Sequence, residues 1–233
     1  MAKLQVAIDG PAGSGKSTAA RLVARELGYV YIDTGALYRA VALVALGMHI
    51  GGNEEEALAK LASTLEVDVR IQPGGALAYF IEGEDVTAKL RSPEVNRLVP
   101  YVAKLPAVRT TVTKKLQRLA KRGGIVMDGR DIGTVVLPSA GVKIFLTADL
   151  ATRVARRKKE LSERGFSQSV NAVKEEVLRR DQEDSSRQLA PLKPAPDAYI
   201  LDTTNLSPDQ VVQAIVNLVK QKKQHMQAGG VEP

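Results

Sequence analysis

Glycines and a lysine near the start of the sequence have a spacing that suits phosphate binding. Residues 10–17 read GPAGSGKS and match the pattern G-x-x-x-x-G-K-[ST]. In this pattern the glycines let backbone N–H groups turn toward a phosphate, and the following helix adds positive potential. Lys16 would reach the β- and γ-phosphates, and the hydroxyl of Ser17 would ligate Mg²⁺. An apolar run before the motif and a helical pattern after it argue against an ordinary glycine turn.

We therefore expect a nucleoside triphosphate to bind at this loop. The residues expected to contact it are Gly10, Pro11, Ala12, Gly13, Ser14, Gly15, Lys16, Ser17 and Thr18. The guanine-reading pattern Asn-Lys-x-Asp is absent from the sequence, which argues against a switch GTPase. If water were the acceptor the protein would be an ATPase, whereas a kinase must also hold a second substrate.

Charged residues stand where two apolar segments end. DTGALYR (33–39) begins at the end of YVYID, and DGRD (128–131) follows the apolar run that starts at residue 123. Ligands of parallel α/β sheets bind beyond the carboxyl ends of the strands. Either stretch alone would more often be a solvated loop, but the two together favour a functional site. The side chains expected there are Thr34, Tyr38, Arg39, Asp128, Arg130 and Asp131.

A helical pattern over residues 169–187 changes from apolar to charged along one face. A stripe of valines begins at Val170 and continues through Val173 to Val177. The same helical steps lead on to Arg180, Asp184 and Arg187. The stripe could leave the core and become solvated, or it could continue into a polar cleft that holds a ligand. We favour the cleft.

Three arginines share one face of the very basic helix expected over residues 150–164. Arg153, Arg156 and Arg157 are spaced i, i+3 and i+4. A solvated basic face is the usual meaning of such a run. A mobile lid that neutralises a transferring phosphoryl group and excludes water needs the same residues.

Composition narrows the function classes. The 233 residues contain no cysteine and two histidines, so a Cys-ligated zinc site and a His-based triad are not expected. The lack of cysteine fits a reducing cytoplasm. No segment has the pattern of a signal peptide or the apolar length of a bilayer span. The net charge of +7 is compatible with nucleic acid, a membrane surface or small anions, but nine aromatic residues offer little for base stacking. We expect small anionic substrates.

Short apolar segments alternate with helical patterns, which predicts an α/β fold with a parallel sheet covered on both faces. The expected strands are residues 4–9, 29–33, 123–129, 142–148 and 198–204. Helices are expected over residues 16–27, 36–46, 53–65, 93–104, 106–122, 150–164, 169–187 and 207–221, with Gly28 ending the first and Asn53 capping the third. Residues 67–86 predict two or three antiparallel strands around a turn at residues 73–75.

Five stretches resemble the bacterial cytidylate kinase family. They are IDGPAGSGKST, DTGALYR, DGRDIGTVV, TRVARRKKEL and RRDQEDSSRQLAPL, and they follow one another in order over nearly the whole chain. The pairing of DTGALYR with GRD distinguishes this family from other small P-loop kinases. The resemblance implies a P-loop kinase with a parallel five-stranded sheet flanked by helices, an inserted subdomain for a nucleoside monophosphate and a helical lid.

The resemblance also implies a domain division. The core would comprise residues 1–66, 106–148 and 188–221, with 67–105 as the inserted subdomain, 149–187 as the lid with its flanking helices, and 222–233 as a flexible tail. The resemblance implies binding of ATP, CMP, dCMP and Mg²⁺. From the sequence itself we further expect a cytoplasmic monomer that binds neither nucleic acid nor a membrane.

The implied reaction is transfer of the γ-phosphoryl group of ATP to CMP or dCMP. By the resemblance, Arg39 and Arg130 hold the acceptor phosphate, with Thr34 and Tyr38 beside it. By the same resemblance, Arg109 and Asp131 contact the cytosine, and Arg180 and Asp184 hold the ribose. The residues around the transferring phosphoryl group are Lys16, Arg153, Arg157 and Arg187. Asp131 would accept from the N4 amine of cytosine, and Arg109 would donate to O2 and N3.

One position departs from the pattern expected of the family. Pro100 stands nine residues before Arg109, where a serine that helps to read the base is expected. Proline has neither a hydroxyl nor an N–H. Base selectivity would then be looser, or a neighbour such as Tyr101 would substitute. Two other functions stay open from the sequence: a kinase for another monophosphate such as UMP, and an RNA-binding regulatory P-loop protein.

Overall fold

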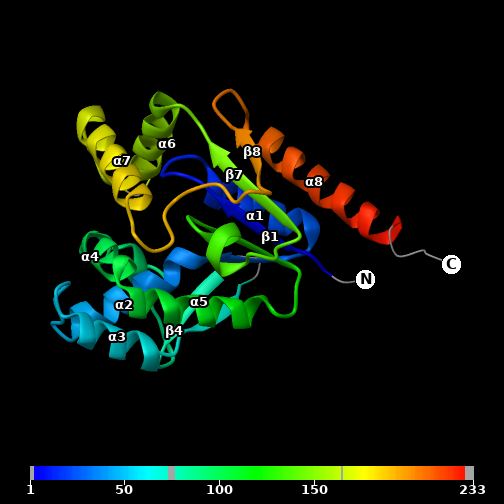
Figure 1. Cartoon of the computed structure of the whole chain (residues 1–233). Coiled ribbons are helices and arrows are strands. Elements are labelled where there is room, and N and C mark those ends of the chain that lie inside the picture. The colour runs from blue at the N-terminus through cyan, green and yellow to red at the C-terminus, as the bar shows by residue number, and fades with distance from the viewer. Residues whose placement is uncertain (1–2, 73–76, 164, 229–233) are drawn as a thin grey trace. The chain divides into compact units, whose positions relative to one another are not determined.

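The computed structural model describes residues 3–72, 77–163 and 165–228 (Figure 1). The chain divides into two compact units, of which the first comprises residues 1–31 and 122–233 and the second comprises residues 32–121. The finer domain division expected from the sequence remains a prediction. Among the helices described, none is both long and apolar enough to cross a membrane.

A five-stranded sheet forms the centre of the fold. Its strands are ordered β2-β6-β1-β7-β8. Their bounds are Val30–Asp33 for β2, Ile125–Gly129 for β6, Gln5–Asp9 for β1, Val142–Thr147 for β7 and Tyr199–Asp202 for β8. The central strand β1 pairs in parallel with both β6 and β7. Val6, Ala7 and Ile8 of β1 are all inaccessible to solvent, so both faces of the sheet are covered. The predicted parallel sheet is confirmed.

Two helices of the first unit pack on one face of this sheet. They are α1 (Lys16–Leu27) and α8 (Pro208–Ala228), which lie beside the strands in Figure 1. Val23 of α1 and Ile215 of α8 join Ile8 of β1 in one apolar core. Gly28 ends α1 in the left-handed conformation, as expected from the sequence.

Helix α8 extends beyond its predicted end at residue 221. Residues 222–228, expected to belong to a tail, continue the helix. They are mostly lysine, glutamine, methionine and alanine, which favour helix. In addition, the ammonium of Lys223 lies 5.0 Å from the centroid of the Tyr29 ring. The last part of the predicted tail, 229–233, lies outside the described residues.

Helices α6 (Leu150–Glu163) and α7 (Val170–Ser185) pack against each other. Val173 and Val177 are buried in their shared core with Val154 of α6. The expectation that Val170 also faces inward is wrong, because its side chain is exposed. Val170 is the first residue of α7 and lies one turn before the first packed position.

The second unit combines helices with a small sheet. Its helices are α2 (Thr34–Gly47), α3 (Glu55–Thr64), η1 (Lys89–Arg91), α4 (Pro93–Lys104) and α5 (Pro106–Ala120). Strands β3 (Asp68–Ile71), β4 (Leu77–Ile81) and β5 (Glu84–Asp85) are antiparallel, as predicted. The turn expected at 73–75 lies outside the described residues. Glu54 and not Asn53 precedes α3, because its backbone N–H and its carboxylate both bond to Gly51.

Candidate functional site

The loop between β1 and α1 has the backbone geometry that its glycines were expected to provide. Gly10, Gly13 and Gly15 all have positive φ angles, of 148°, 75° and 88°. A Cβ at Gly10 would lie 2.0 Å from the carbonyl oxygen of Leu146, so a larger residue does not fit there. Gly15 precedes the first residue of α1, so the first N–H groups of that helix, which have no acceptor within the helix, open onto the loop.

Lys16 is folded back over this loop. Its Nζ donates to the carbonyl oxygen of Pro11 over 2.6 Å and to Ser14 Oγ over 3.4 Å. Burial, followed by the positive charge of Arg130, lowers the pKa of Lys16 to about 7. An anionic ligand at the loop would favour the charged form of this lysine.

Ser17 and Asp128 bring two kinds of oxygen together. The Ser17 hydroxyl donates to Asp128 Oδ2 over 2.7 Å, and the Tyr31 hydroxyl donates to Asp128 Oδ1 over 2.8 Å. Asp128 is buried near the end of β6. A hydroxyl and a carboxylate are the hard oxygen donors that Mg²⁺ prefers, so this pair fits the metal expected from the sequence.

Asp9, a residue not predicted to have a role, anchors the segment after DGRD. Its two carboxylate oxygens accept from the N–H groups of Ile132 and Gly133 over 2.8 and 2.7 Å. These residues begin a short π-helical turn, η2 (Ile132–Val136), that was also not predicted. Burial raises the pKa of Asp9 to about 6 despite these two hydrogen bonds. Asp9 thereby fixes the backbone next to Arg130 and Asp131.

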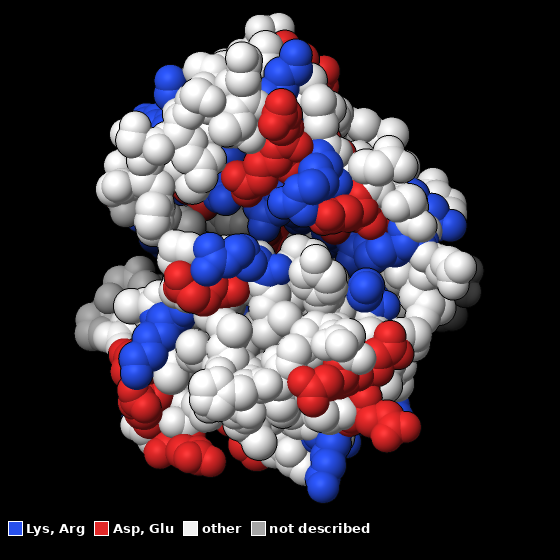
Figure 2. Space-filling view, turned by 90° about the vertical axis from the view of Figure 1, so that its left-hand side faces the viewer, with Lys and Arg blue, Asp and Glu red and all other residues white. Residues whose placement is uncertain are grey.

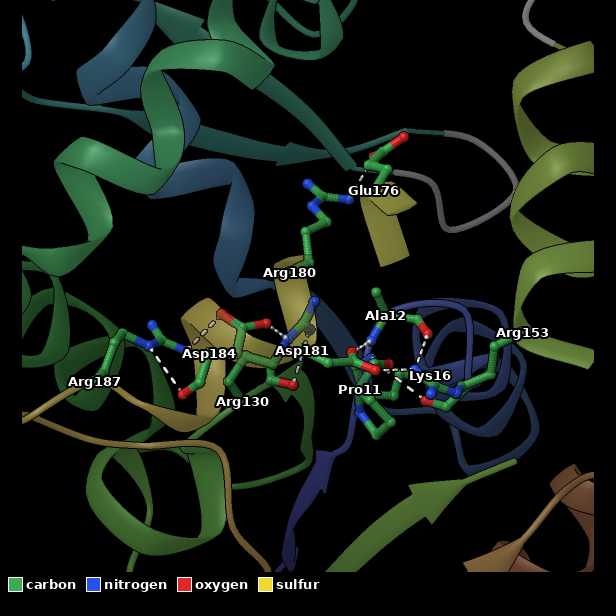
Figure 3. Close-up of polar contacts among 12 residues, drawn as sticks. Pro11, Ala12, Lys16, Arg130, Arg153, Glu176, Arg180, Asp181, Asp184 and Arg187 are labelled. Carbon is green, nitrogen blue, oxygen red and sulfur yellow. Dashed lines mark hydrogen bonds and ion pairs between the residues drawn. The ribbon is translucent and has the colours of Figure 1, made fainter. Parts of the chain in front are cut away.

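Two arginines that were expected in the site, Arg130 and Arg187, both bond to the carboxylate of a third expected residue, Asp184. Asp184 Oδ2 accepts from Arg130 Nε, and Asp184 Oδ1 accepts from Arg187 Nη2 over 2.8 Å (Figure 3). Burial acts to raise the pKa of Asp184, but Arg130 and Arg187 outweigh it and hold the pKa below its ordinary value. The charged face of the predicted helix thus does contact an arginine from the segment after β6.

The arginines of α6 are ion-paired or hydrogen-bonded rather than freely solvated. Arg157 donates to Glu160 over 3.0 Å and to Glu176 over 2.9 Å, and Arg180 lies 3.4 Å from the same Glu176. Arg156 donates to both the hydroxyl and the carbonyl oxygen of Thr203, at 2.8 and 2.7 Å.

The third of these arginines, Arg153, is buried. Its Nε donates to the carbonyl oxygen of Ala148 over 3.1 Å, and its Nη1 donates to Ala12 in the glycine-rich loop over 3.3 Å. Arg153 also pairs with Asp181, a residue that was not predicted. No local pattern indicates that pair, since the partners are 28 residues apart.

In the second unit, Asp33 is the anionic partner of two arginines. It accepts from Arg39 Nη1 over 3.4 Å and from Arg91 Nη2 over 2.9 Å. Arg91 was not predicted. The guanidinium of Arg39 lies over Gly35, where a Cβ would be 2.8 Å from Arg39 Nη1. Thr34 is buried in the first turn of α2.

Arg109 and Tyr38 lie together, also in the second unit. The guanidinium carbon of Arg109 is 5.7 Å from the centroid of the Tyr38 ring. Arg109 Nη1 donates to the carbonyl oxygen of Ala103, near the end of α4, over 2.9 Å. Pro100 lies inside α4, where it has no backbone N–H to donate. Tyr101 is half exposed, and a Cβ on Gly52 would be 2.9 Å from Tyr101 Cβ and Cγ.

Comparison with known proteins places the chain in a family. A family model described as cytidylate kinase matches residues 6–221. A cytidylate kinase of Bacillus licheniformis is 47% identical over 222 residues, covering 95% of this chain and 98% of that protein. One of Geobacillus sp. (strain WCH70) is 48% identical over 219 residues, covering 94% and 97%. A gluconokinase structure from Sinorhizobium meliloti 1021 matches with a TM-score of 0.50 at 13% identity, covering 99% of each chain, and so shares the fold.

Proposed function

The chain belongs to the cytidylate kinase family, and on this premise we propose that it transfers the γ-phosphoryl group of ATP to CMP or dCMP. The products are ADP and the corresponding diphosphate. The observation that carries the proposal is the family match over residues 6–221, which contains the glycine-rich loop and every charged stretch of the site.

ATP binds at residues 10–18, with its phosphates on the N–H groups of the loop and Lys16 at the β- and γ-phosphates. Ser17 and Asp128 would hold Mg²⁺, since they offer a hydroxyl and a carboxylate oxygen 2.7 Å apart at this loop. The ion, when bound, neutralises charge on the β- and γ-phosphates.

In this proposal CMP binds through the charges and hydrogen-bond donors that the family resemblance assigns to it. Arg39 and Arg130 bind its phosphate, and Thr34 and Tyr38 lie beside it. Arg109 and Asp131 read the cytosine, and Arg180 and Asp184 hold the ribose. The contact of Asp184 with Arg130 supports this assignment, since it links a ribose residue to a phosphate residue.

The reaction needs little proton transfer from the protein. A phosphate monoester has a second pKa near ~6, so the acceptor oxygen of CMP is already deprotonated at neutral pH. The main barrier is the repulsion between two polyanions and the charge on the transferring group. Lys16, Arg153, Arg157 and Arg187 offset that charge. Arg157 exchanges its contacts with Glu160 and Glu176 for phosphate oxygens when residues 149–187 close as a lid.

The charged surface is consistent with small anionic ligands. On the face that Figure 2 shows, lysines and arginines are interspersed with acidic residues and do not form one continuous basic field. A monomeric state and a cytoplasmic location remain predictions from the sequence.

The test is an assay of ADP release from ATP and Mg²⁺ with CMP, dCMP, UMP and AMP as separate acceptors. We expect CMP and dCMP to exceed UMP in kcat/KM by at least about 10-fold, because a site built to hydrogen-bond a substrate group rejects an analogue that mismatches it. A higher kcat/KM for UMP would overturn the base assignment. Salt-dependent RNA binding with no transfer to any monophosphate would overturn the proposed reaction.

A further inference from the structure

A single carboxylate of α7 links the glycine-rich loop to helix α6. Asp181 Oδ1 accepts from the backbone N–H of Ala12 over 3.4 Å, and Asp181 Oδ2 accepts from Arg153 Nη1 (Figure 3). Ala12 and Asp181 are 169 residues apart in the sequence. The carboxylate therefore joins three segments, namely the loop proposed to receive ATP, the start of α6 and the C-terminal part of α7.

The surroundings of Arg153 explain why this carboxylate matters. Arg153 is 9% exposed, and its other hydrogen bonds go to the carbonyl oxygens of Ala148 and Ala12. Carbonyl oxygens satisfy N–H donors but carry no net charge that could compensate a buried guanidinium. A Cβ at Gly13 would be 2.6 Å from the backbone carbonyl oxygen of Arg153, so the first turn of α6 packs directly on the loop. Asp181 supplies the missing negative charge at this packed contact.

We propose that Asp181 is a positioning residue that holds Arg153 against the glycine-rich loop. Only the expected effect on kcat rests on the proposed function. A cation that stabilises a transferring phosphoryl group is most effective when it is already oriented before the reaction. Asp181 touches neither nucleotide in this proposal and acts through Arg153. Without it, the guanidinium keeps two carbonyl contacts but loses its ionic partner and its fixed direction.

The same helix provides a matched control. Glu183 pairs with Arg179 over 2.7 Å on the outer side of α7, and both side chains are largely exposed, at 44% and 58%. The variants Asp181→Asn and Glu183→Gln each replace one paired carboxylate by an amide of the same size. Asp181→Glu restores a carboxylate at the proposed position. Comparing the three variants separates the loss of this particular charge from the loss of any charge on α7.

The first measurement is independent of catalysis and uses ¹H–¹⁵N NMR to follow the Nη1–H signals of Arg153, the group that donates to Asp181. We expect slow hydrogen exchange at this group in the wild type, in Glu183→Gln and in Asp181→Glu, because the guanidinium is buried and held. Exchange should become faster by at least about 10-fold in Asp181→Asn, because Nη1 loses its charged acceptor. This factor corresponds to about 1.4 kcal/mol. Unchanged exchange in Asp181→Asn would overturn the proposal.

The second measurement is a double-mutant cycle on CMP phosphorylation. We expect Asp181→Asn to lower kcat by about 10- to 100-fold, as for a misplaced catalytic group. In an Arg153→Gln background the same change should alter kcat by less than about twofold, because the residue through which Asp181 acts is already lost. If the reduction of kcat in the double variant equals the product of the reductions in the two single variants, Asp181 acts independently of Arg153, contrary to the proposal.

The two measurements also distinguish failure of the proposal from failure of the proposed function. If the wild type transfers no phosphoryl group to CMP or dCMP, the proposed function is wrong, while the NMR comparison still decides whether Asp181 holds Arg153. If transfer is normal but Asp181→Asn changes neither hydrogen exchange nor kcat, the function stands and the role of Asp181 is wrong. Thermal unfolding of every variant shows whether any loss of kcat comes from unfolded protein.

Discussion

The hydroxyl of Ser17 donates to Asp128 Oδ2 over 2.7 Å, although 111 residues separate them in the sequence. The bond connects the start of α1, where the phosphates of ATP are expected, to the end of β6, where DGRD begins. The glycine-rich stretch and DGRD, which are far apart in the sequence, therefore meet at this pair of oxygens. Tyr31 holds the other oxygen of Asp128 and so fixes the direction of the carboxylate.

Replacing Asp128 by asparagine should weaken the use of Mg²⁺. We expect the rate at saturating ATP and CMP to fall by about 10- to 100-fold, with a higher Mg²⁺ concentration needed for half of the maximal rate, because an amide is a weaker ligand than a carboxylate. The measurement is the rate of ADP release as a function of free Mg²⁺. Tyr31→Phe is the comparison variant: it keeps the carboxylate and loses only the hydrogen bond that orients it, so its Mg²⁺ requirement should rise less than that of Asp128→Asn. An unchanged Mg²⁺ requirement in Asp128→Asn would contradict the metal assignment.

Asp9 should make the free energy of unfolding depend on pH. Burial raises its pKa in the folded protein to about 6 from an ordinary value of 3.8. The folded state therefore binds the proton more tightly than the unfolded state. The resulting contribution to the free energy of unfolding is complete below pH 3.8 and is lost as pH rises through about 6. This part of the free energy of unfolding amounts to at most about 3 kcal/mol, since each pKa unit corresponds to ~1.4 kcal/mol.

Urea unfolding of the wild type and of Asp9→Asn between pH 4.5 and 7.5, a range of about three units around the raised pKa, isolates the contribution of Asp9. Asparagine does not titrate, so the difference in stability between wild type and variant should shrink as pH rises. A difference that is constant or that grows with pH would show that the carboxyl of Asp9 is not protonated more readily in the folded protein.

Asp184 should show the opposite dependence. Its burial is outweighed by Arg130 and Arg187, which lower its pKa in the folded protein. Its stabilising effect is therefore present above the ordinary pKa of aspartate and is lost as pH falls through the lowered value. We expect Asp184→Asn to lose about 2 kcal/mol of unfolding free energy at pH 7, a typical value for hydrogen bonds to charged groups.

Chemical denaturation of Asp184→Asn and of the exposed control Glu183→Gln checks this effect. The control should lose less than about 1 kcal/mol, because surface ion pairs contribute little. The deficit of Asp184→Asn should also shrink toward acidic pH, where the wild-type carboxylate becomes protonated. Equal losses in the two variants at pH 7 would mean that the contact of Asp184 with Arg130 and Arg187 is not stabilising.

Local sequence signals predicted most elements of the fold. Gly28 ends α1 and Pro106 begins α5 where expected, because a left-handed residue and a missing N–H determine helix ends locally. The strand segments were also recognisable, since strands buried on both faces are apolar throughout. The end of α8 was placed too early, because polar residues that favour helix look the same in a tail and in an exposed helix.

Features that depend on distant partners were not predictable in the same way. The π-helical turn η2 is held by Asp9, whose hydrogen bonds span 123 and 124 residues. The link from Asp181 to Ala12 spans 169 residues. Nothing in the composition of either segment indicates these pairs. The contacts of Asp184 with Arg130 and Arg187 could be anticipated only because helical periodicity and strand ends were considered together.

Binding of CMP to Lys16→Ala, measured by calorimetry and compared with phosphoryl transfer by the same variant, tests most directly whether donor and acceptor have separate sites. We predict that transfer falls by about 1,000-fold, because a cation that stabilises charge in the transition state is lost. The dissociation constant for CMP should stay within about threefold of the wild-type value, since Lys16 serves the phosphates of ATP. Loss of CMP binding in the same proportion as transfer would contradict a kinase that holds its two nucleotides at separate sites.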